Sequence, residues 1–277
     1  MFLATYKNTF KNLFRSVTFW LILTVLLITV VHGGWKGHYL GDSDPSFVLI
    51  YREYVQTLTN IVCAKLLMYA LPIFTIFSVV LVLNRDHGDK FFEIEKCAGI
   101  KPYAYLWGRL AAIVTLNTVI LYLMSMLSSF IYIFTRGGVE GLETGDMIVE
   151  TLIRLARLDL FDAMPTLLFY IGLTYMIGSI FKNGIPAAIL SIGYVIAYYV
   201  FSLMFRFRIS PTYFDYFSPI PYNLRRYFHY YDTEWWEGMV KNYDLTIGKV
   251  AICIGFLVGV GVLCSLISHL CVRKRTT

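Results

Sequence analysis

Long apolar stretches alternate with shorter polar segments along this chain. Each apolar stretch approaches the ~20 residues that an α-helix needs to cross the hydrocarbon core of a bilayer. The pattern predicts six transmembrane helices, at residues 17–31, 61–83, 110–134, 165–181, 186–205 and 250–270. We therefore expect an all-α, polytopic membrane protein in which residues 1–277 form one transmembrane domain.

The fourth and fifth predicted helices are separated by very few residues. The sequence between them reads Lys182-Asn183-Gly184, and Pro186 lies two residues further on. Proline is well tolerated in the first turn of a helix, where its missing N–H would have no partner inside the helix. The spacing thus predicts a tight helical hairpin.

Residues 1–16 have the pattern of an amphipathic helix. Leu3, Tyr6, Phe10, Leu13 and Phe14 recur at helical spacing, and basic residues occupy another face: Lys7, Lys11 and Arg15. Such a helix is typical of segments that lie in the membrane interface. A plain basic anchor before the first span would explain the charges, but it would not explain the two separate faces.

A second short amphipathic helix is predicted at residues 86–98, between the second and third spans. Phe91, Ile94 and Ala98 share one helical face, and Gly99 is suited to end the helix. Charged residues occupy the remainder: Lys90, Glu93 and Lys96. The apolar face would lie either on the bilayer or in the groove of a soluble partner.

Composition supports a membrane location. The hydrophobic fraction is 57% and the charged fraction is 15%, whereas about 25% of residues are charged in a typical soluble domain. This excludes a disordered chain, a collagen-like chain and a nucleic-acid-binding domain, and it argues against an ordinary soluble enzyme. None of the five cysteines falls in the long polar loops that we expect outside the membrane, and the sequence has no Asn-x-Ser/Thr acceptor. Both features suit a multi-pass protein of the bacterial inner membrane.

Orientation follows from the distribution of Lys and Arg, which are enriched in cytoplasmic loops. Half of the 24 Lys and Arg residues fall on one side of the predicted spans: Lys7, Lys11, Arg15, Arg85, Lys90, Lys96, Lys101, Arg109, Lys182, Arg273, Lys274 and Arg275. Acidic residues on that side are few. We therefore expect this side, with both termini, to be cytoplasmic, and we interpret the net charge of +6 as topology.

Motifs for catalysis or cofactor binding are missing from the sequence. It has no P-loop, no H-E-x-x-H and no G-x-S-x-G, so we expect no catalytic residue, no metal and no cofactor in this chain. Polar residues in the third span would either line a pathway or join helices: Asn117, Ser125, Ser128 and Ser129. Gly255, Gly259 and Gly261 in the sixth span indicate close helix packing.

The segment at residues 206–249, predicted to lie outside, is long and rich in Tyr and Trp. Aromatic side chains of this kind form belts at the headgroup level. A re-entrant hairpin that closes the outer end of a pathway would have the same composition, and the sequence leaves the two interpretations open.

These features together resemble the ABC-2 type permease family, the membrane subunits of a class of ABC exporters. The similarity covers the whole chain through the N-terminal interfacial helix, the six spans and the long outer segment. Local similarity is found in Gly88-Asp89-Lys90-Phe91-Phe92-Glu93, in Lys101-Pro102, in Gly108-Arg109 and in Ser218-Pro219. Arg109 stands where the family usually has Lys.

The resemblance implies a transport function. Two permeases, either identical or homologous, would form a pathway between them in the membrane lipid, and two copies of a separate ATP-binding subunit would bind ATP and Mg. The coupling helix would transmit the motion of that subunit through Asp89, Lys90, Phe91, Phe92, Glu93, Ile94 and Lys96. The cargo would be a lipid-like, peptide or drug-like amphipathic molecule. The alternatives are an integral membrane enzyme and a non-transporting sensor or assembly subunit.

Overall fold

The computed structural model describes residues 2–36, 71–88, 94, 97–99, 101–136, 164–205 and 247–276. Within these ranges the secondary structure is entirely helical. The helices are α1 (Phe2–Arg15), α2 (Val17–Lys36), α4 (Leu71–Gly88), α6 (Pro102–Arg136), α8 (Met164–Phe181), α9 (Gly184–Phe205) and α13 (Ile247–Thr276). This fits a chain in lipid, because a helix satisfies all of its backbone hydrogen bonds within one segment.

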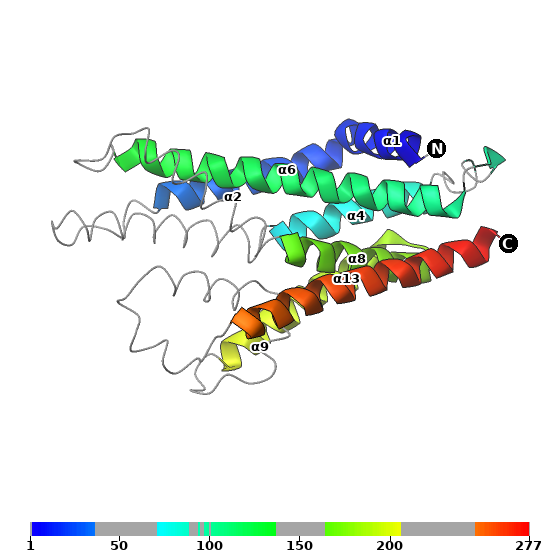
Figure 1. The fold of residues 1–277 in the computed structure, drawn as a ribbon. Helices are drawn as coiled ribbons and strands as arrows, with labels where there is room; N and C mark the ends of the chain where they lie inside the picture. Colours follow the sequence, from blue (N-terminus) through cyan, green and yellow to red (C-terminus); the bar gives the residue numbers. More distant parts are fainter. Residues whose placement is uncertain are drawn as a thin grey trace.

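The long helices run alternately up and down and form a bundle, with both chain termini at the same end (Figure 1). Helix α8 occupies the interior because α4, α9 and α13 all pack against it. Its side chains Tyr170 and Tyr175 are fully enclosed, as are Phe74 and Ile76 of α4 and Ile113 of α6. The core therefore lies between α4, α6, α8 and α13.

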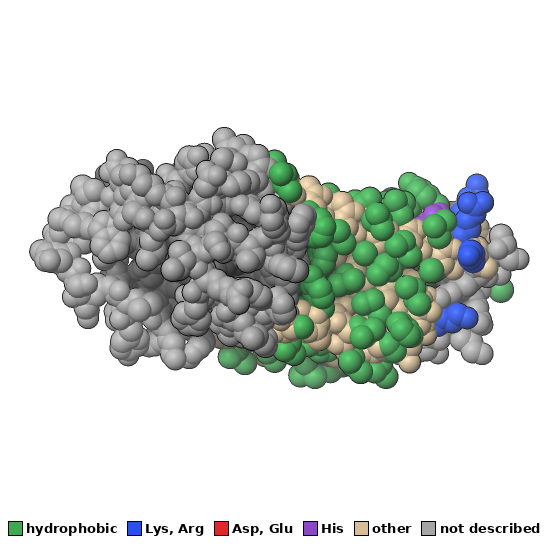
Figure 2. Space-filling view, turned by 90° about the horizontal axis from the view of Figure 1, so that it is seen from below, with side chains coloured by type: hydrophobic (Ala, Val, Ile, Leu, Met, Phe, Trp, Pro, Cys, Tyr) green, Lys and Arg blue, Asp and Glu red, His purple; other side chains and the backbone are tan. Residues whose placement is uncertain are grey.

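Several helices have the length and composition of membrane spans. Among the described residues, three helices qualify: Pro102–Met124, Met164–Phe181 and Ile254–Lys274; the bent pair α1 and α2 would make a fourth. Large apolar side chains cover the outside of α2, including Val17, Leu21 and Val25. Figure 2 shows hydrophobic side chains over most of the described face and Lys and Arg at one end. The chain is thus a multi-pass membrane protein.

The helices extend further toward the basic end than the sequence predicted. Helix α4 continues to Gly88, and α6 begins at Pro102 rather than at residue 110. Arg85, Asp86 and Arg109, which we expected in a cytoplasmic loop, belong to these helices instead. Asp86, where the predicted coupling helix begins, lies within α4 and is buried beside Arg109. The coupling helix itself stays a prediction.

The predicted hairpin between α8 and α9 is present. Lys182 has a φ of 55°, which reverses the chain. The Asn183 side chain then accepts a hydrogen bond from the backbone N–H of Ile185 at 2.9 Å. The Asn84 side-chain oxygen accepts another from the N–H of Gly184 at 3.1 Å. These two amides satisfy donors that the first turn of α9 leaves without an intrahelical partner.

Helices α8 and α13 approach each other to backbone contact. A Cβ atom added at Gly261 would lie 2.7 Å from the carbonyl oxygen of Leu168, and Gly172 faces the backbone of Gly261 in the same way. The expected close packing through α13 therefore occurs at Gly261. Gly255 and Gly259, predicted to share this role, meet no atom within 4 Å.

Candidate functional site

Polar and charged side chains gather at the end of the bundle that carries Lys and Arg, the basic end, where α1 crosses the first turns of α6. Helix α1 is bent by 71° relative to α2. It buries Thr5, Thr9 and Leu13, and Thr9 donates a hydrogen bond to the carbonyl of Thr5 at 2.8 Å. Gly108 of α6 lies directly beneath, since a Cβ atom there would come within 3.1 Å of Thr5 Cβ. The absence of a side chain at residue 108 lets the two helices touch.

A row of aromatic side chains runs along α1 beside this contact, and Phe10 packs against the core. Tyr6 and Phe10 have ring centroids 5.1 Å apart, and Phe10 and Phe14 are 6.2 Å apart. Phe14 also lies 6.0 Å from Trp20 of α2, whose indole N–H donates to the carbonyl of Phe14 at 2.7 Å. Because Phe14 and Trp20 remain about half exposed, this face is available to lipid, as the sequence pattern of an interfacial helix requires.

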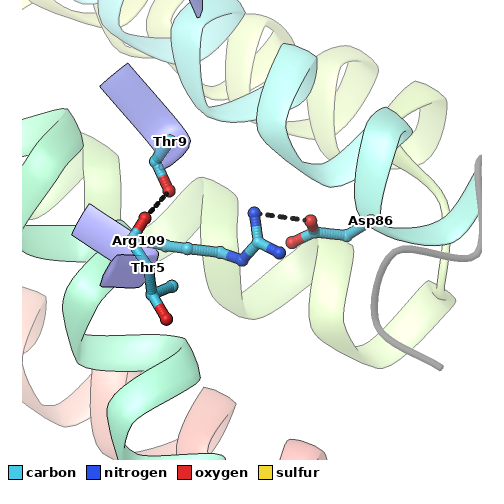
Figure 3. Close-up of polar contacts among 4 residues, drawn as sticks. All are labelled: Thr5, Thr9, Asp86 and Arg109. Carbon is cyan, nitrogen blue, oxygen red and sulfur yellow. Dashed lines mark hydrogen bonds and ion pairs between the residues drawn. The ribbon is translucent and has the colours of Figure 1, made fainter. Parts of the chain in front are cut away.

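A buried ion pair joins α4 to α6 beside α1. Arg109 Nη1 lies 2.8 Å from Asp86 Oδ1, and the two side chains are only 4% and 1% exposed. The Arg109 guanidinium also lies 4.3 Å from the centre of the Tyr105 ring. Figure 3 shows Arg109 extending toward Asp86 beside the part of α1 that carries Thr5 and Thr9. Removing either partner would take away the opposite charge that lies beside the other buried group.

A cavity of about 330 Å³ opens between the end of α1, the end of α4 and Arg109. Its lining combines three guanidinium groups, two amides and two hydroxyls with a few apolar side chains. The residues are Thr9, Asn12, Leu13, Arg15, Ser16, Leu81, Val82, Asn84, Arg85 and Arg109. Sequence reasoning placed several of these charges on the cytoplasmic side but did not bring them together.

Asn117, a predicted pathway residue, lies fully buried between α6 and α4. Its side-chain oxygen accepts a hydrogen bond from Thr75 at 3.1 Å, and its amide nitrogen donates to Ser78 at 3.0 Å. These bonds fit the helix-joining interpretation of this residue. Ser125, Ser128 and Ser129 lie on the same helix, but their side chains fall outside the described part, so their role stays a prediction.

Most of the predicted coupling helix also lies outside the described residues, including Asp89, Lys90, Phe91, Phe92, Glu93 and Lys96. Ile94 is 57% exposed, and its carbonyl accepts a hydrogen bond from the N–H of Ala98 at 3.0 Å. Gly99 follows with a φ of 74°, which suits the end of a helical turn. The contact of this segment with a partner remains a prediction, as do the structure of residues 206–246 and the start of the second span before Leu71. Residues 247–249, which we expected in the outer segment, belong to α13.

Comparison with known proteins gives no relative: no protein-family model matches this chain, and no curated protein matches it. Within the described ranges, no group of three or more His, Cys, Asp or Glu side chains is arranged to hold a metal ion. The site is therefore defined by its own geometry. It consists of α1 laid across α6, the Asp86–Arg109 pair and the arginine-lined cavity.

Proposed function

We propose that this chain is the permease subunit of an ATP-driven exporter of the ABC-2 type. Two permeases would form the pathway for a lipid-like, peptide or drug-like amphipathic molecule, and a separate ATP-binding subunit would supply the energy. The resemblance in sequence motivates this function. An ion pair between two helices at the basic end of the bundle is the structural observation that supports it.

That ion pair joins the last turn of α4 to the second turn of α6. These helices flank residues 89–101, which contain the proposed coupling helix, and Asp86 and Arg109 connect them close to that segment. Farther along the same two helices, Asn117 bonds Thr75 and Ser78. A force applied to residues 89–101 would therefore move α4 and α6 together. Coupling of this kind needs two helices that respond as one body.

The alternating helices are the basis for the proposed topology. Helices α2, α4, α6, α8, α9 and α13 would supply six spans, with α1 in the interface. Their basic ends coincide with the end that carries both termini (Figure 1), and enrichment in Lys and Arg marks a cytoplasmic side. We therefore place α1, the coupling segment and both termini in the cytoplasm of a bacterial cell, next to the ATP-binding subunits.

The coupling helix can be tested by replacing Phe91 and Phe92 with Ala together. Buried aromatic anchors typically contribute about 2 kcal/mol or more to an interface, which corresponds to roughly a thirtyfold change in affinity. We expect the variant to insert normally, to bind the co-expressed ATP-binding subunit more weakly and to lose transport. Affinity co-purification and a transport assay would measure these two effects.

Control variants separate coupling from general damage. Glu143→Ala and Asp146→Ala, predicted to lie on the opposite side of the membrane, should leave association unchanged. Normal co-purification and transport by the Phe91→Ala, Phe92→Ala variant would show that this helix does not couple. ATP hydrolysis by the purified chain alone would contradict the proposed permease itself, because the sequence has no phosphate-binding loop.

A further inference from the structure

The arginine-lined cavity at the basic end has the size and position of a small ligand site. Its volume of about 330 Å³ lies at the lower end of the range for ligand pockets, about 300–1,000 Å³. It lies at the bend where α1 meets α2, because Arg15 and Ser16 form part of its wall. Its described lining includes neither the described residues of the proposed coupling helix nor Asn117.

The charge of the lining selects an anion. Arg15, Arg85 and Arg109 contribute three guanidinium groups, and none of the described residues that line the cavity is acidic. Asp86, which forms an ion pair with Arg109, is not among these lining residues. A guanidinium offers five N–H donors in a planar fork that matches the oxygens of a phosphate, so one arginine can serve both an ion pair and a phosphate.

Neutral hydrogen-bond donors line the cavity in addition to the arginines. Asn12 and Ser16 line the cavity beside Arg15. The Asn84 side chain uses its oxygen to cap α9, and its amide nitrogen is a donor. Each of these groups can donate a hydrogen bond to an oxygen of a phosphate group. The lining thus combines charge with a set of donors, as sites that recognise phosphate do.

The surroundings of the cavity favour a lipid as the source of the phosphate. The aromatic side chains Phe14 and Trp20 lie on either side of the bend between α1 and α2, and both are about half exposed. Arg15, the last residue of α1, is also exposed. Aromatic rings at the headgroup level contact acyl chains, whereas basic pockets between helices bind anionic headgroups. A phospholipid presents these two chemical surfaces together, and a soluble phosphate presents only one.

We propose that this cavity binds the phosphate group of an anionic phospholipid, which fixes α1 against α4 and α6 at the bend. The bound lipid is a resident of the site and is not the transported molecule. This inference does not depend on the proposed exporter function, since it rests on the cavity, its charge and the adjoining aromatic face.

Native mass spectrometry of the full chain in detergent tests the proposal with three added probes: phosphatidylglycerol, diacylglycerol and inorganic phosphate. Two matched pairs of variants separate the cavity from its surroundings. Arg15→Gln is paired with Lys11→Gln, and Asn12→Asp is paired with Asn8→Asp. Each pair makes the same change of charge on the same helix, at one residue that lines the cavity and one exposed residue that does not.

We expect phosphatidylglycerol to bind the unmodified chain and diacylglycerol to fail. Arg15→Gln and Asn12→Asp should each weaken phosphatidylglycerol binding about tenfold or more, because a hydrogen bond to a charged group is lost or a like charge is added. Lys11→Gln and Asn8→Asp should bind as the unmodified chain does. A thermal unfolding curve for each variant checks that it is folded.

Other results would overturn the proposal. An equal loss of phosphatidylglycerol binding in both members of each pair would show that general attraction of the lipid to a basic surface explains the binding. Equal binding by all variants would place the lipid elsewhere. If inorganic phosphate binds with the expected variant pattern and phosphatidylglycerol does not, the phosphate site is retained and the lipid is excluded as its occupant.

Discussion

At the scale of single residues, Asp86 and Arg109 form an ion pair that is buried at the basic end of the bundle. Charged side chains near the ends of apolar helices usually extend to the headgroups or to water. Here both are buried and bonded to each other at 2.8 Å, and Tyr105 covers the guanidinium. The pair therefore connects α4 to α6 through two buried charges.

Neutralising one member of the pair should be more harmful than neutralising both. We expect Asp86→Asn to lower the free energy of unfolding by about 3–5 kcal/mol, since it leaves the Arg109 charge buried. The double variant Asp86→Asn, Arg109→Gln should recover part of this loss. Thermal unfolding in detergent would show the order of the midpoints, and Lys101→Gln, at an exposed position of the same end, should not change the midpoint. Equal midpoints for the single and double variants would contradict the importance of the pair.

The sequence did not reveal this pair because charge type alone does not report pairing. Asp86 and Arg109 are separated by a connecting segment, and each lies near a helix end where charges are usually solvated. The aromatic and basic faces of α1 were predictable because helical periodicity places them directly. Its contact with α6 was less so, since Thr5 and Thr9 are polar and only the small size of Gly108 shows why they fit.

At the scale of whole helices, the crossing of α8 and α13 leaves no room for a side chain at its closest point. Their backbones meet at Gly172 and Gly261, where a side chain has no space. Periodicity and hydropathy predicted the presence of both helices. Which of the three glycines of α13 faces α8 was not predictable, because that depends on the rotation of the helix in the bundle.

Gly261→Ala and Gly259→Ala provide a matched test of this crossing. The added methyl group at residue 261 would meet the backbone of α8, so we expect a loss of about 1–3 kcal/mol from overpacking. At residue 259 the methyl group meets open space, and alanine should be neutral or slightly stabilising because it favours the helix. Thermal unfolding of both variants in the same detergent measures the difference. A loss at residue 259 equal to that at residue 261 would show that the crossing is not the cause.

At the scale of the whole molecule, sequence and structure agree on a helical membrane protein over the residues that the structure describes. Apolar stretches predict this well because lipid leaves few alternatives to a helix. The helix ends were less predictable, since our predicted spans stopped at the first charges, whereas α4 and α6 continue beyond them.

The proposed orientation predicts a labelling pattern in intact cells. Single cysteines introduced at Ser43, Glu143 and Thr233 should react with a thiol reagent that cannot cross the membrane, because those residues are predicted to lie outside. A cysteine at Asp89 should react only after the cells are opened. The native cysteines would first be replaced, and the cysteine-free chain supplies the background. Labelling at residue 89 in sealed cells would reverse the topology.

The hydrogen bond from Gly184 to Asn84 has a consequence for the synthesis of the chain. The group that caps α9 comes from a residue 100 positions earlier, so the ribosome has already made the cap when the α8–α9 turn emerges. The second half of the bundle can therefore assemble on a template formed by the first half. A fragment that contained only the second half would lack this bond. The turn between α8 and α9 therefore gains its cap from Asn84 only when the first half is present.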